Sequence, residues 1–337
     1  MFGLGHLSRC LCLAKELVKT YKISFIIKSD DQLKVTTFIN TIFNSDNTNV
    51  ISFIDKHTTI ANEILFIIDE VTKNNSFLIL DHYEADESYQ KRLYENNIKW
   101  LQFDSHALIN FYATFILHGS PDATNDKYLP LLINKKAELL LGTKYAIVGE
   151  NFRKFKKVNY RTAAIQRVLL CFGGGDDNNA TFKCLSLLNL SEFDSIEFYI
   201  VISDLNQRKE DILKIASNHA NVVVSINESQ IYKEMNKSDL AIISPGTLSY
   251  EAACIALPML LISIADNQMI NASGWVRIEA AKYLGTIDNL NTSCLNQELR
   301  TINEDVEGRI KMHHNCLSAI DGNGVVRIKN RIDKFIG

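Results

Sequence analysis

Residues 167–188 read RVLLCFGGGDDNNATFKCLSLL, which predicts a buried strand, a glycine-rich turn and a helix in that order. The apolar run at 167–172 is typical of a strand covered on both faces, and 180–188 is expected to be helical. Glycines in such a turn let backbone N–H groups approach a ribose or pyrophosphate at the positive end of the helix dipole. The alternative is a tight turn that needs positive φ.

The alternation of strands and helices extends in both directions from this stretch. Apolar runs predict further strands at 23–27, 50–53, 77–80, 99–104, 197–202, 222–225, 240–244 and 259–264, with helical stretches between them. This series predicts an α/β fold with parallel sheets covered by helices on both faces. Ligands of such sheets gather at the carboxyl ends of the strands.

A polar and basic stretch at 151–161 interrupts the alternation and is typical of an interdomain connection. We therefore expect an N-terminal Rossmann-like domain over 1–155 and a C-terminal Rossmann-like domain over 156–288. A chain of 337 residues is long enough for two such domains. The remaining residues, 289–337, carry no recognisable motif, and we expect a helical C-terminal extension.

The first nine residues contain Gly3, Gly5, His6 and Arg9 in the pattern G-x-G-H-x-x-R, directly before an amphipathic helix. Glycines and a helix start favour a bound phosphate. A histidine side chain has an unperturbed pKa of about 6.5, which suits general acid or base catalysis near neutrality. Arg9 would face the same ligand one turn along the helix. The alternative is an ordinary helix start at which His6 caps the helix or is solvated.

A run of polar residues follows the strand predicted at 77–80, in the string LDHYE. Asp81, His82 and Tyr83 would lie at a strand end, where a parallel sheet delivers residues to a ligand. The alternative is a polar turn in which Asp81 caps a helix.

The string ISPGTLSYE, which ends at Glu251, forms a third turn between a strand and a helix. Backbone N–H groups of Thr247 and Leu248 could cap a diphosphate there, and Glu251 could accept hydrogen bonds from ribose hydroxyls. Asn267 and Gln268, after the strand at 259–264, are suited to holding sugar or amide oxygens. The alternatives are a capped helix with a solvated glutamate and ordinary amides in a turn.

Composition excludes several classes of function. The net charge of −3 argues against nucleic acid as a partner. Seven cysteines without zinc spacing indicate buried thiols in a reducing cytoplasm. There is no signal peptide pattern and no apolar run long enough to span a membrane. Carboxylates are dispersed apart from Asp176 and Asp177, so we expect no metal and no cofactor.

Six ordered motifs resemble one family: GLGHLSRC, LDHYE, LLLGTKYAIVGENF, CFGGGD, ISPGTLSYEA and DNQ. Together they resemble the UDP-2,4-diacetamido-2,4,6-trideoxy-β-L-altropyranose hydrolases of pseudaminic acid biosynthesis, whose wider relatives are GT-B glycosyltransferases of the MurG type. The resemblance implies a GT-B-like fold, with two Rossmann-like domains whose parallel sheets face an interdomain cleft. It implies hydrolysis of a UDP-linked acetamido sugar at the anomeric carbon, without a metal.

The resemblance also implies roles for individual residues. His6 matches the catalytic histidine and would act as general base on water, while Tyr83 and Asn267 match residues that hold and align the sugar. The expected substrate-binding residues, from motif chemistry and resemblance together, are Gly5, Arg9, Asp81, His82, Gly173, Gly174, Gly175, Asp176, Pro245, Gly246, Thr247, Leu248, Glu251 and Gln268.

This sequence departs from the family at its start, because the family opens with a strand before the first glycine and this chain begins inside the loop. The first strand of the N-terminal domain is therefore expected to be missing. Two other functions stay open: a GT-B glycosyltransferase that uses a UDP-N-acetyl sugar, and an inactive UDP-sugar binder. We expect a cytoplasmic monomer whose partner is a small UDP-sugar.

Overall fold

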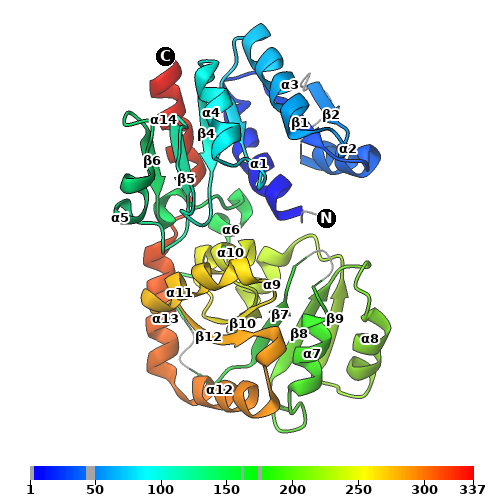
Figure 1. Cartoon of the computed structure of the whole chain (residues 1–337). Coiled ribbons are helices and arrows are strands. Elements are labelled where there is room, and N and C mark those ends of the chain that lie inside the picture. Colours follow the sequence, from blue (N-terminus) through cyan, green and yellow to red (C-terminus); the bar gives the residue numbers. More distant parts are fainter. Residues whose placement is uncertain (1–3, 43–49, 161–162, 174–176) are drawn as a thin grey trace. The chain divides into compact units, whose positions relative to one another are not determined.

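The computed structural model describes residues 4–42, 50–160, 163–173 and 177–337, and Figure 1 labels its helices and strands. The chain forms two compact units. The N-terminal unit consists of Gly5–Gly119, Ala123–Ile147 and Gly324–Gly337, and the C-terminal unit contains Ser120–Asp122 and Val148–Asn323. Neither unit is continuous in sequence, whereas the sequence predicted uninterrupted domains and a separate C-terminal extension.

The N-terminal unit contains two parallel sheets. One sheet pairs β1 (Ser24–Lys28) with β2 (Val50–Ile54). The other has the strand order β3 (Leu78–Leu80), β4 (Trp100–Phe103), β5 (Phe115–His118) and β6 (Glu138–Leu141). The helices are α1 (Leu4–Leu17), α2 (Gln32–Ile42), α3 (Ile60–Lys73), α4 (Glu87–Glu95), α5 (Asn125–Tyr128) and α14 (Gly324–Ile336), with short 3-10 turns at Leu129–Leu131 and Thr143–Tyr145.

Helices cover both faces of the four-stranded sheet, because its side chains alternate between two apolar layers. On one face Leu101 packs in a cluster with Leu13 of α1 and Ile328 of α14. On the other face Ile116 packs in a cluster with Ile64 of α3. Each fully buried side chain of this kind contributes about 1.5–3 kcal/mol of burial free energy. Figure 1 shows α14, at the end of the chain, alongside these strands.

The C-terminal unit is built on one six-stranded sheet in which all neighbouring strands are parallel. Its strands are β7 (Arg167–Cys171), β8 (Glu197–Ile202), β9 (Val222–Ile226), β10 (Leu240–Ile243), β11 (Met259–Ser263) and β12 (Ala281–Thr286). Their order is β12-β11-β10-β7-β8-β9. The order in which the chain adds strands to the sheet reverses between β7 and β10, although the two strands are parallel. Doubly wound folds bind ligands at the carboxyl ends of the two strands on either side of such a reversal.

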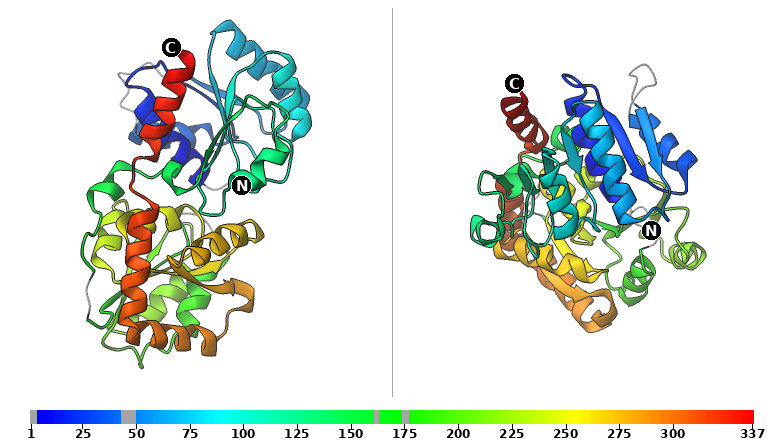
Figure 2. Two further views of the ribbon diagram at one scale, coloured as in Figure 1. Left: turned by 90° about the vertical axis from the view of Figure 1, so that its left-hand side faces the viewer. Right: turned by 45° about the horizontal axis from the view of Figure 1, so that its top comes forward.

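Helices pack against this sheet, and Figure 2 shows the helices and strands of this unit from two further directions. Leu185 of α7, Ile212 of α8 and Leu295 of α12 belong to an apolar cluster with Leu170 of β7. The helices of this unit are α6 (Glu150–Lys154), α7 (Ala180–Leu187), α8 (Lys209–Ser217), α9 (Ile231–Lys237), α10 (Thr247–Ile255), α11 (Met269–Arg277), α12 (Thr292–Glu304) and α13 (Val306–Ala319), with 3-10 turns at Asp266–Gln268 and Ile287–Asn289.

The structure confirms the predicted α/β class with parallel sheets. The sequence did not predict β5, β6 or β12, and it predicted an irregular connection where α6 forms. Helices α12, α13 and α14 follow residue 289.

Candidate active site

His6 and Arg9 lie on one side of α1, because residues three apart face the same way on a helix. The sequence placed Gly5 and His6 on a loop before this helix, but both lie within its first turn. The helix begins at Leu4, directly before them. Gly3 lies outside the described residues.

Asp81 joins His6 and Arg9 into one cluster within the N-terminal unit. It directly follows β3, at the carboxyl end of that strand. Its Oδ1 lies 2.7 Å from Nδ1 of His6, and Arg9 donates from Nε to Oδ2 at 2.6 Å and from Nη2 to Oδ1 at 2.5 Å. The thiol of Cys10 also donates a hydrogen bond to Oδ2 of Asp81, at 3.5 Å. The Asp81 side chain is only 6% exposed, so its negative charge is held by Arg9 in a two-bond pair.

The charge on Asp81 is stable at neutral pH. Burial alone would raise its pKa, but the hydrogen bonds and charges of Arg9 and His6 outweigh burial and bring the pKa of Asp81 down to about 2. Burial likewise lowers the pKa of Arg9, and the bond to Asp81 reverses this, so that the net shift is upward. An ionised carboxylate only accepts hydrogen bonds. The 2.7 Å contact with this carboxylate assigns a proton to Nδ1 of His6, although Nη2 of Arg9 also lies 3.0 Å from that nitrogen. In the neutral ring Nε2 is then the basic atom.

Two aromatic rings complete the surroundings of this cluster. The edge of the Tyr83 ring meets His6, with 4.3 Å between ring centroids and 69° between ring planes. The guanidinium of Arg9 lies over the ring of Phe103, 4.8 Å from its centroid. Tyr83 is half-exposed, and burial of its hydroxyl raises its pKa, so it stays a neutral phenol that can donate a hydrogen bond.

His82, which we expected to contact substrate, instead uses both ring nitrogens within the protein. Its Nε2 lies 2.9 Å from Oε1 of Glu63, and its Nδ1 accepts a hydrogen bond of 2.9 Å from the backbone N–H of Glu84. Asp81 is engaged in the same way, by His6 and Arg9. Neither side chain reaches a ligand without giving up bonds inside the unit.

The glycine-rich turn of the C-terminal unit follows β7. Gly173 has a φ of +124°, a conformation that other residues rarely adopt. Gly174, Gly175 and Asp176 lie outside the described residues. Asp177 lies three residues before the start of α7, and its Oδ2 accepts a 3.0 Å hydrogen bond from the backbone N–H of Thr181 in that helix.

Pro245 and Gly246 lead from β10 into α10. Gly246 is the residue before the helix, so the N–H groups of Thr247 and Leu248 belong to the first turn, which has no intrahelical acceptors. The carbonyl of Pro245 accepts a hydrogen bond from the side chain of Asn271. These N–H groups form the kind of site that binds a phosphate.

Glu251 lies in the second turn of α10, in a partly covered position. Burial raises its pKa to about 8. Among the residues that the structure describes, it makes no hydrogen bond or ion pair. A carboxyl group in this state gains from a ligand that supplies hydrogen-bond partners.

Asn267 and Gln268 form a 3-10 turn after β11. Asn267 is exposed, whereas Oε1 of Gln268 accepts a 2.9 Å hydrogen bond from the backbone N–H of Ile264. A Cβ atom placed on Gly246 would lie 3.7 Å from Nε2 of Gln268, so this amide sits beside the start of α10.

Asn271, which the sequence analysis missed, links several parts of this region. Its Oδ1 accepts hydrogen bonds of 2.9 Å from Ser120 and 2.9 Å from Tyr250, and its amide holds Pro245. Its position one helical turn after Gln268 was the available signal.

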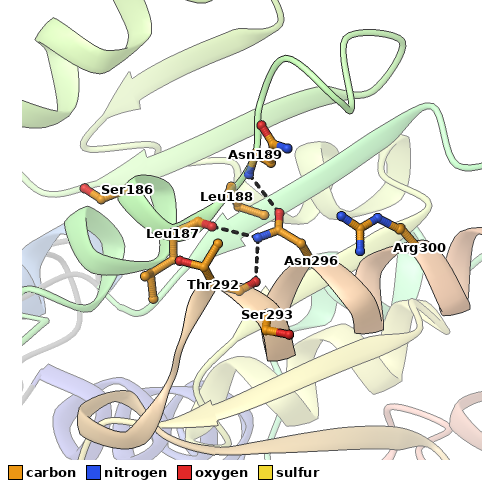
Figure 3. Close-up of a pocket in the computed structure, with 8 residues that line it drawn as sticks. All are labelled: Ser186, Leu187, Leu188, Asn189, Thr292, Ser293, Asn296 and Arg300. Carbon is orange, nitrogen blue, oxygen red and sulfur yellow. Dashed lines mark hydrogen bonds between the residues drawn. The ribbon is translucent and has the colours of Figure 1, made fainter.

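A cavity of about 350 Å³ lies elsewhere in the C-terminal unit, between the end of α7 and the start of α12 (Figure 3). Asn296 donates to the carbonyls of Leu187 and Thr292 and accepts from the N–H of Asn189. Its amide is thus fully used in joining two helices, and none of the predicted site residues lines this cavity.

Two absences apply to the described part of the chain. It contains no group of three or more His, Cys, Asp or Glu residues placed to hold a metal ion. Nor does any helix there have the length and apolar character needed to cross a membrane.

No family model matches this chain. Three curated proteins are similar to it in sequence. The uncharacterized protein MJ1062 of Methanocaldococcus jannaschii is 28% identical over 271 residues, 77% of this chain and 53% of that protein. The chain thus spans about half the length of this relative. The UDP-2,4-diacetamido-2,4,6-trideoxy-β-L-altropyranose hydrolase of Campylobacter jejuni is 27% identical over 217 residues, 64% of this chain and 76% of the enzyme. The spore coat polysaccharide biosynthesis protein SpsG of Bacillus subtilis is 20% identical over 331 residues, 97% and 93% of the two chains.

Solved structures share the whole architecture. Acinetobacter baumannii MurG has a TM-score of 0.69 at 15% identity and covers 98% of this chain and 97% of its own. Staphylococcus aureus MnaA, solved with UDP, has a TM-score of 0.68 at 11% identity, with coverage of 99% and 95%. These likenesses, together with the two parallel-sheet units, identify the chain as an α/β protein of the GT-B fold with two Rossmann-like domains.

Proposed function

We propose that this protein is an enzyme of nucleotide-sugar metabolism that hydrolyses a UDP-linked diacetamido-trideoxy sugar at the anomeric carbon. The observation that carries the proposal is the cluster of His6, Asp81 and Arg9, which presents a basic imidazole nitrogen backed by a buried carboxylate. The similarity to the Campylobacter jejuni hydrolase supports this choice of substrate class. A role in nonulosonate biosynthesis of the pseudaminic acid type follows from the same similarity.

In the proposed reaction, His6 is the general base. Nε2 takes a proton from water as the water oxygen forms a bond to the anomeric carbon. The bond between that carbon and the diphosphate oxygen breaks, and UDP leaves with the electron pair. The ionised Asp81 stabilises the imidazolium that forms and fixes the ring orientation, while Arg9 keeps Asp81 in place. General base catalysis of this kind contributes roughly 10²–10⁴ in rate.

The other predicted residues have distinct parts in this proposal. Tyr83, whose ring touches His6, and Asn267 hold and align the sugar. Backbone N–H groups of Gly173, Thr247 and Leu248 bind the diphosphate, which stabilises the negative charge of the leaving group. A ribose hydroxyl would give the Glu251 carboxyl a hydrogen-bond partner that the described residues do not supply. Gly174, Gly175, Asp176, Pro245, Gly246 and Gln268 remain predicted contacts of the nucleotide and sugar.

A glycosyltransferase is the second candidate, and the likeness to MurG over nearly the whole chain favours it. The same imidazole would then remove a proton from an acceptor hydroxyl instead of water. The two candidates differ in one property, because a transferase needs an acceptor for sustained release of UDP.

The test is incubation of the purified protein with UDP-linked diacetamido sugars, with EDTA present, followed by NMR of UDP and sugar. The hydrolase proposal predicts free sugar and UDP in equal amounts without an acceptor. UDP release that requires an added acceptor supports the transferase, and UDP binding without turnover indicates an inactive binder. His57→Ala is the matched control for His6→Ala, because His57 is an exposed histidine of the same unit.

A further inference from the structure

We propose that Glu63 of α3 is a positioning residue, which acts through His82 to hold Asp81 and Tyr83 in place around His6. The proposal rests on the function proposed above. Glu63 is distant from these residues in sequence, and its carboxylate touches neither His6 nor Arg9. Its effect on the reaction would be carried by the loop that follows β3.

Glu63 is the centre of a buried polar cluster in the N-terminal unit. It is 1% exposed, although it lies on an apolar helix face with Ile64 and Ile67. Its Oε1 accepts from the hydroxyl of Tyr89 at 3.0 Å and lies 2.9 Å from Nε2 of His82. Its Oε2 lies 2.9 Å from Nζ of Lys28, the last residue of β1. A buried carboxylate is tolerable only with such partners, so the cluster fixes the positions of all of them.

His82 transmits this constraint to the backbone of the loop. Besides the bond to Glu63, its Nδ1 accepts from the N–H of Glu84 at 2.9 Å, and its carbonyl accepts from the N–H of Ala85 at 3.2 Å. With Nδ1 as acceptor and Nε2 as donor, the neutral ring matches both of its partners. The His82 side chain thus stabilises the turn and connects it to Glu63 of α3.

The two neighbours of His82 in the chain are the residues that surround the proposed base. Asp81 binds Nδ1 of His6 at 2.7 Å, and the ring of Tyr83 lies 4.3 Å from the ring of His6 between centroids. A shift of the His82 backbone moves both of them. Catalytic groups tolerate little displacement, since a misplacement of about 1 Å can cost 10²-fold in rate.

The partners of Glu63 also favour its ionised form. Burial would raise the pKa of Glu63, but the hydrogen bonds from His82 and Lys28 outweigh it and lower the pKa to about 2. Lys28 makes a second ion pair with Glu84 at 3.3 Å, so strand β1, helix α3 and the loop share one network. Glu63 therefore stays ionised, and paired with Lys28, across the neutral range.

The experiment compares four variants of the full chain: Glu63→Ala, Glu63→Gln, His82→Gln and Tyr89→Phe. Tyr89→Phe is the matched control, because it removes a bond to the same carboxylate without altering the loop. Glu63→Gln is the conservative change, which retains an acceptor oxygen for His82. His82→Gln retains a donor toward Glu63 but loses the acceptor for Glu84.

We expect Glu63→Ala to lower kcat by about tenfold or more with KM within twofold, and Glu63→Gln to recover part of that loss. His82→Gln should lower kcat in the same way. Tyr89→Phe should lower the melting temperature while leaving kcat within twofold. Equal losses of kcat in Tyr89→Phe and Glu63→Ala would overturn the proposal, because they would indicate general destabilisation.

A measurement on the ring itself separates this proposal from the proposed function. NMR of ¹⁵N-labelled histidine reports the Nδ1 proton of His6 without any substrate. We expect this signal to change in Glu63→Ala and to stay as in the wild type in Tyr89→Phe. A folded Glu63→Ala protein with an unaltered His6 signal would refute the positioning role. If the His6 signal is altered in Glu63→Ala but the wild-type protein hydrolyses no UDP-sugar, only the hydrolase proposal is refuted.

Discussion

Asp81 accepts a 2.7 Å hydrogen bond from Nδ1 of His6, although 75 residues separate the two in the chain. The helix that carries His6 and the strand end that carries Asp81 meet because both pack around the same apolar cluster, through Leu13 of α1 and Ile79 of β3. The first prediction depends directly on this pair.

Replacement Asp81→Asn should lower kcat by at least 10²-fold, because the amide can present a donor to Nδ1 and favour the wrong tautomer of His6. The variant also leaves the partly buried Arg9 without its anion, which we expect to lower the free energy of unfolding. Steady-state UDP release and urea unfolding check the two effects. Asp30→Asn, at a half-exposed aspartate of the same unit, is the control and should change neither. A rate for Asp81→Asn near that of the wild type would contradict the assignment.

Low pH should lower the free energy of unfolding of the N-terminal unit, because Asp81 and Glu63 become protonated. The pKa of Asp81 falls from an ordinary 3.8 to about 2, so the unfolded chain takes up its proton first as the pH falls. The stability that this carboxylate provides is complete above about pH 4 and is lost as the pH falls toward 2, by roughly 2 kcal/mol. Glu63, with a pKa lowered from 4.5 to about 2, acts in the same direction.

Urea unfolding at pH 7 and pH 3 measures this loss. Asp81→Asn and Glu63→Gln should each be less stable than the wild type at pH 7 and should lose less stability on acidification. An equal loss in the wild type and both variants would show that other groups cause the acid sensitivity.

Glu251 should affect stability and ligand binding in opposite directions. Burial raises its pKa from 4.5 to about 8, so the folded state holds a proton that the unfolded chain releases between these values. Stability from this group therefore falls as the pH rises from about 4.5 to 8. Glu251→Gln should raise the melting temperature at pH 8 and weaken UDP binding about tenfold, equivalent to about 1.4 kcal/mol.

Calorimetric titration with UDP and thermal unfolding at pH 6 and pH 8 check both effects. Glu210→Gln on α8, an exposed glutamate of the same unit, should leave both quantities unchanged. UDP affinity unaltered in Glu251→Gln would remove the proposed ribose contact.

The packing of Ser120–Asp122 on α11 should be sensitive to a single methyl group. A Cβ on Gly274 would lie 2.9 Å from the backbone nitrogen of Asp122, whose carboxylate pairs with Arg277 at 2.6 Å. Gly274→Ala should therefore cost about 1–3 kcal/mol of unfolding free energy, measured by urea unfolding. Ser273→Ala, at the neighbouring exposed position, is the control and should stay within about 0.5 kcal/mol of the wild type.

The fold was largely predictable because buried parallel strands appear in the sequence as short apolar runs. Strand β7 and the glycine turn after it were found in this way. Strands β5 and β6 were missed because they lie among loops and short turns, without the alternation with helices that marks the other strands. Strand β12 was missed because its sequence, AKYLGT, is not a continuous apolar run.

The candidate site was predictable in its residue types but not in its partnerships. Motif spacing found His6, Asp81 and Tyr83, yet nothing local indicates that His6 and Arg9 both bind Asp81. Contacts over such separations follow from tertiary packing, which a single sequence does not encode locally. Glu63 left a detectable signal, because a charged residue interrupts the apolar face of α3 beside Ile64.

The most direct test of the account is hydrolysis in H₂¹⁸O by the wild type, His6→Ala and His57→Ala. The account predicts ¹⁸O at the anomeric carbon of the released sugar and none in UDP, with the His6→Ala rate reduced by about 10²-fold or more and the His57→Ala rate unchanged. A His6→Ala enzyme that retains the full rate, or ¹⁸O found in the phosphate of UDP, would contradict it.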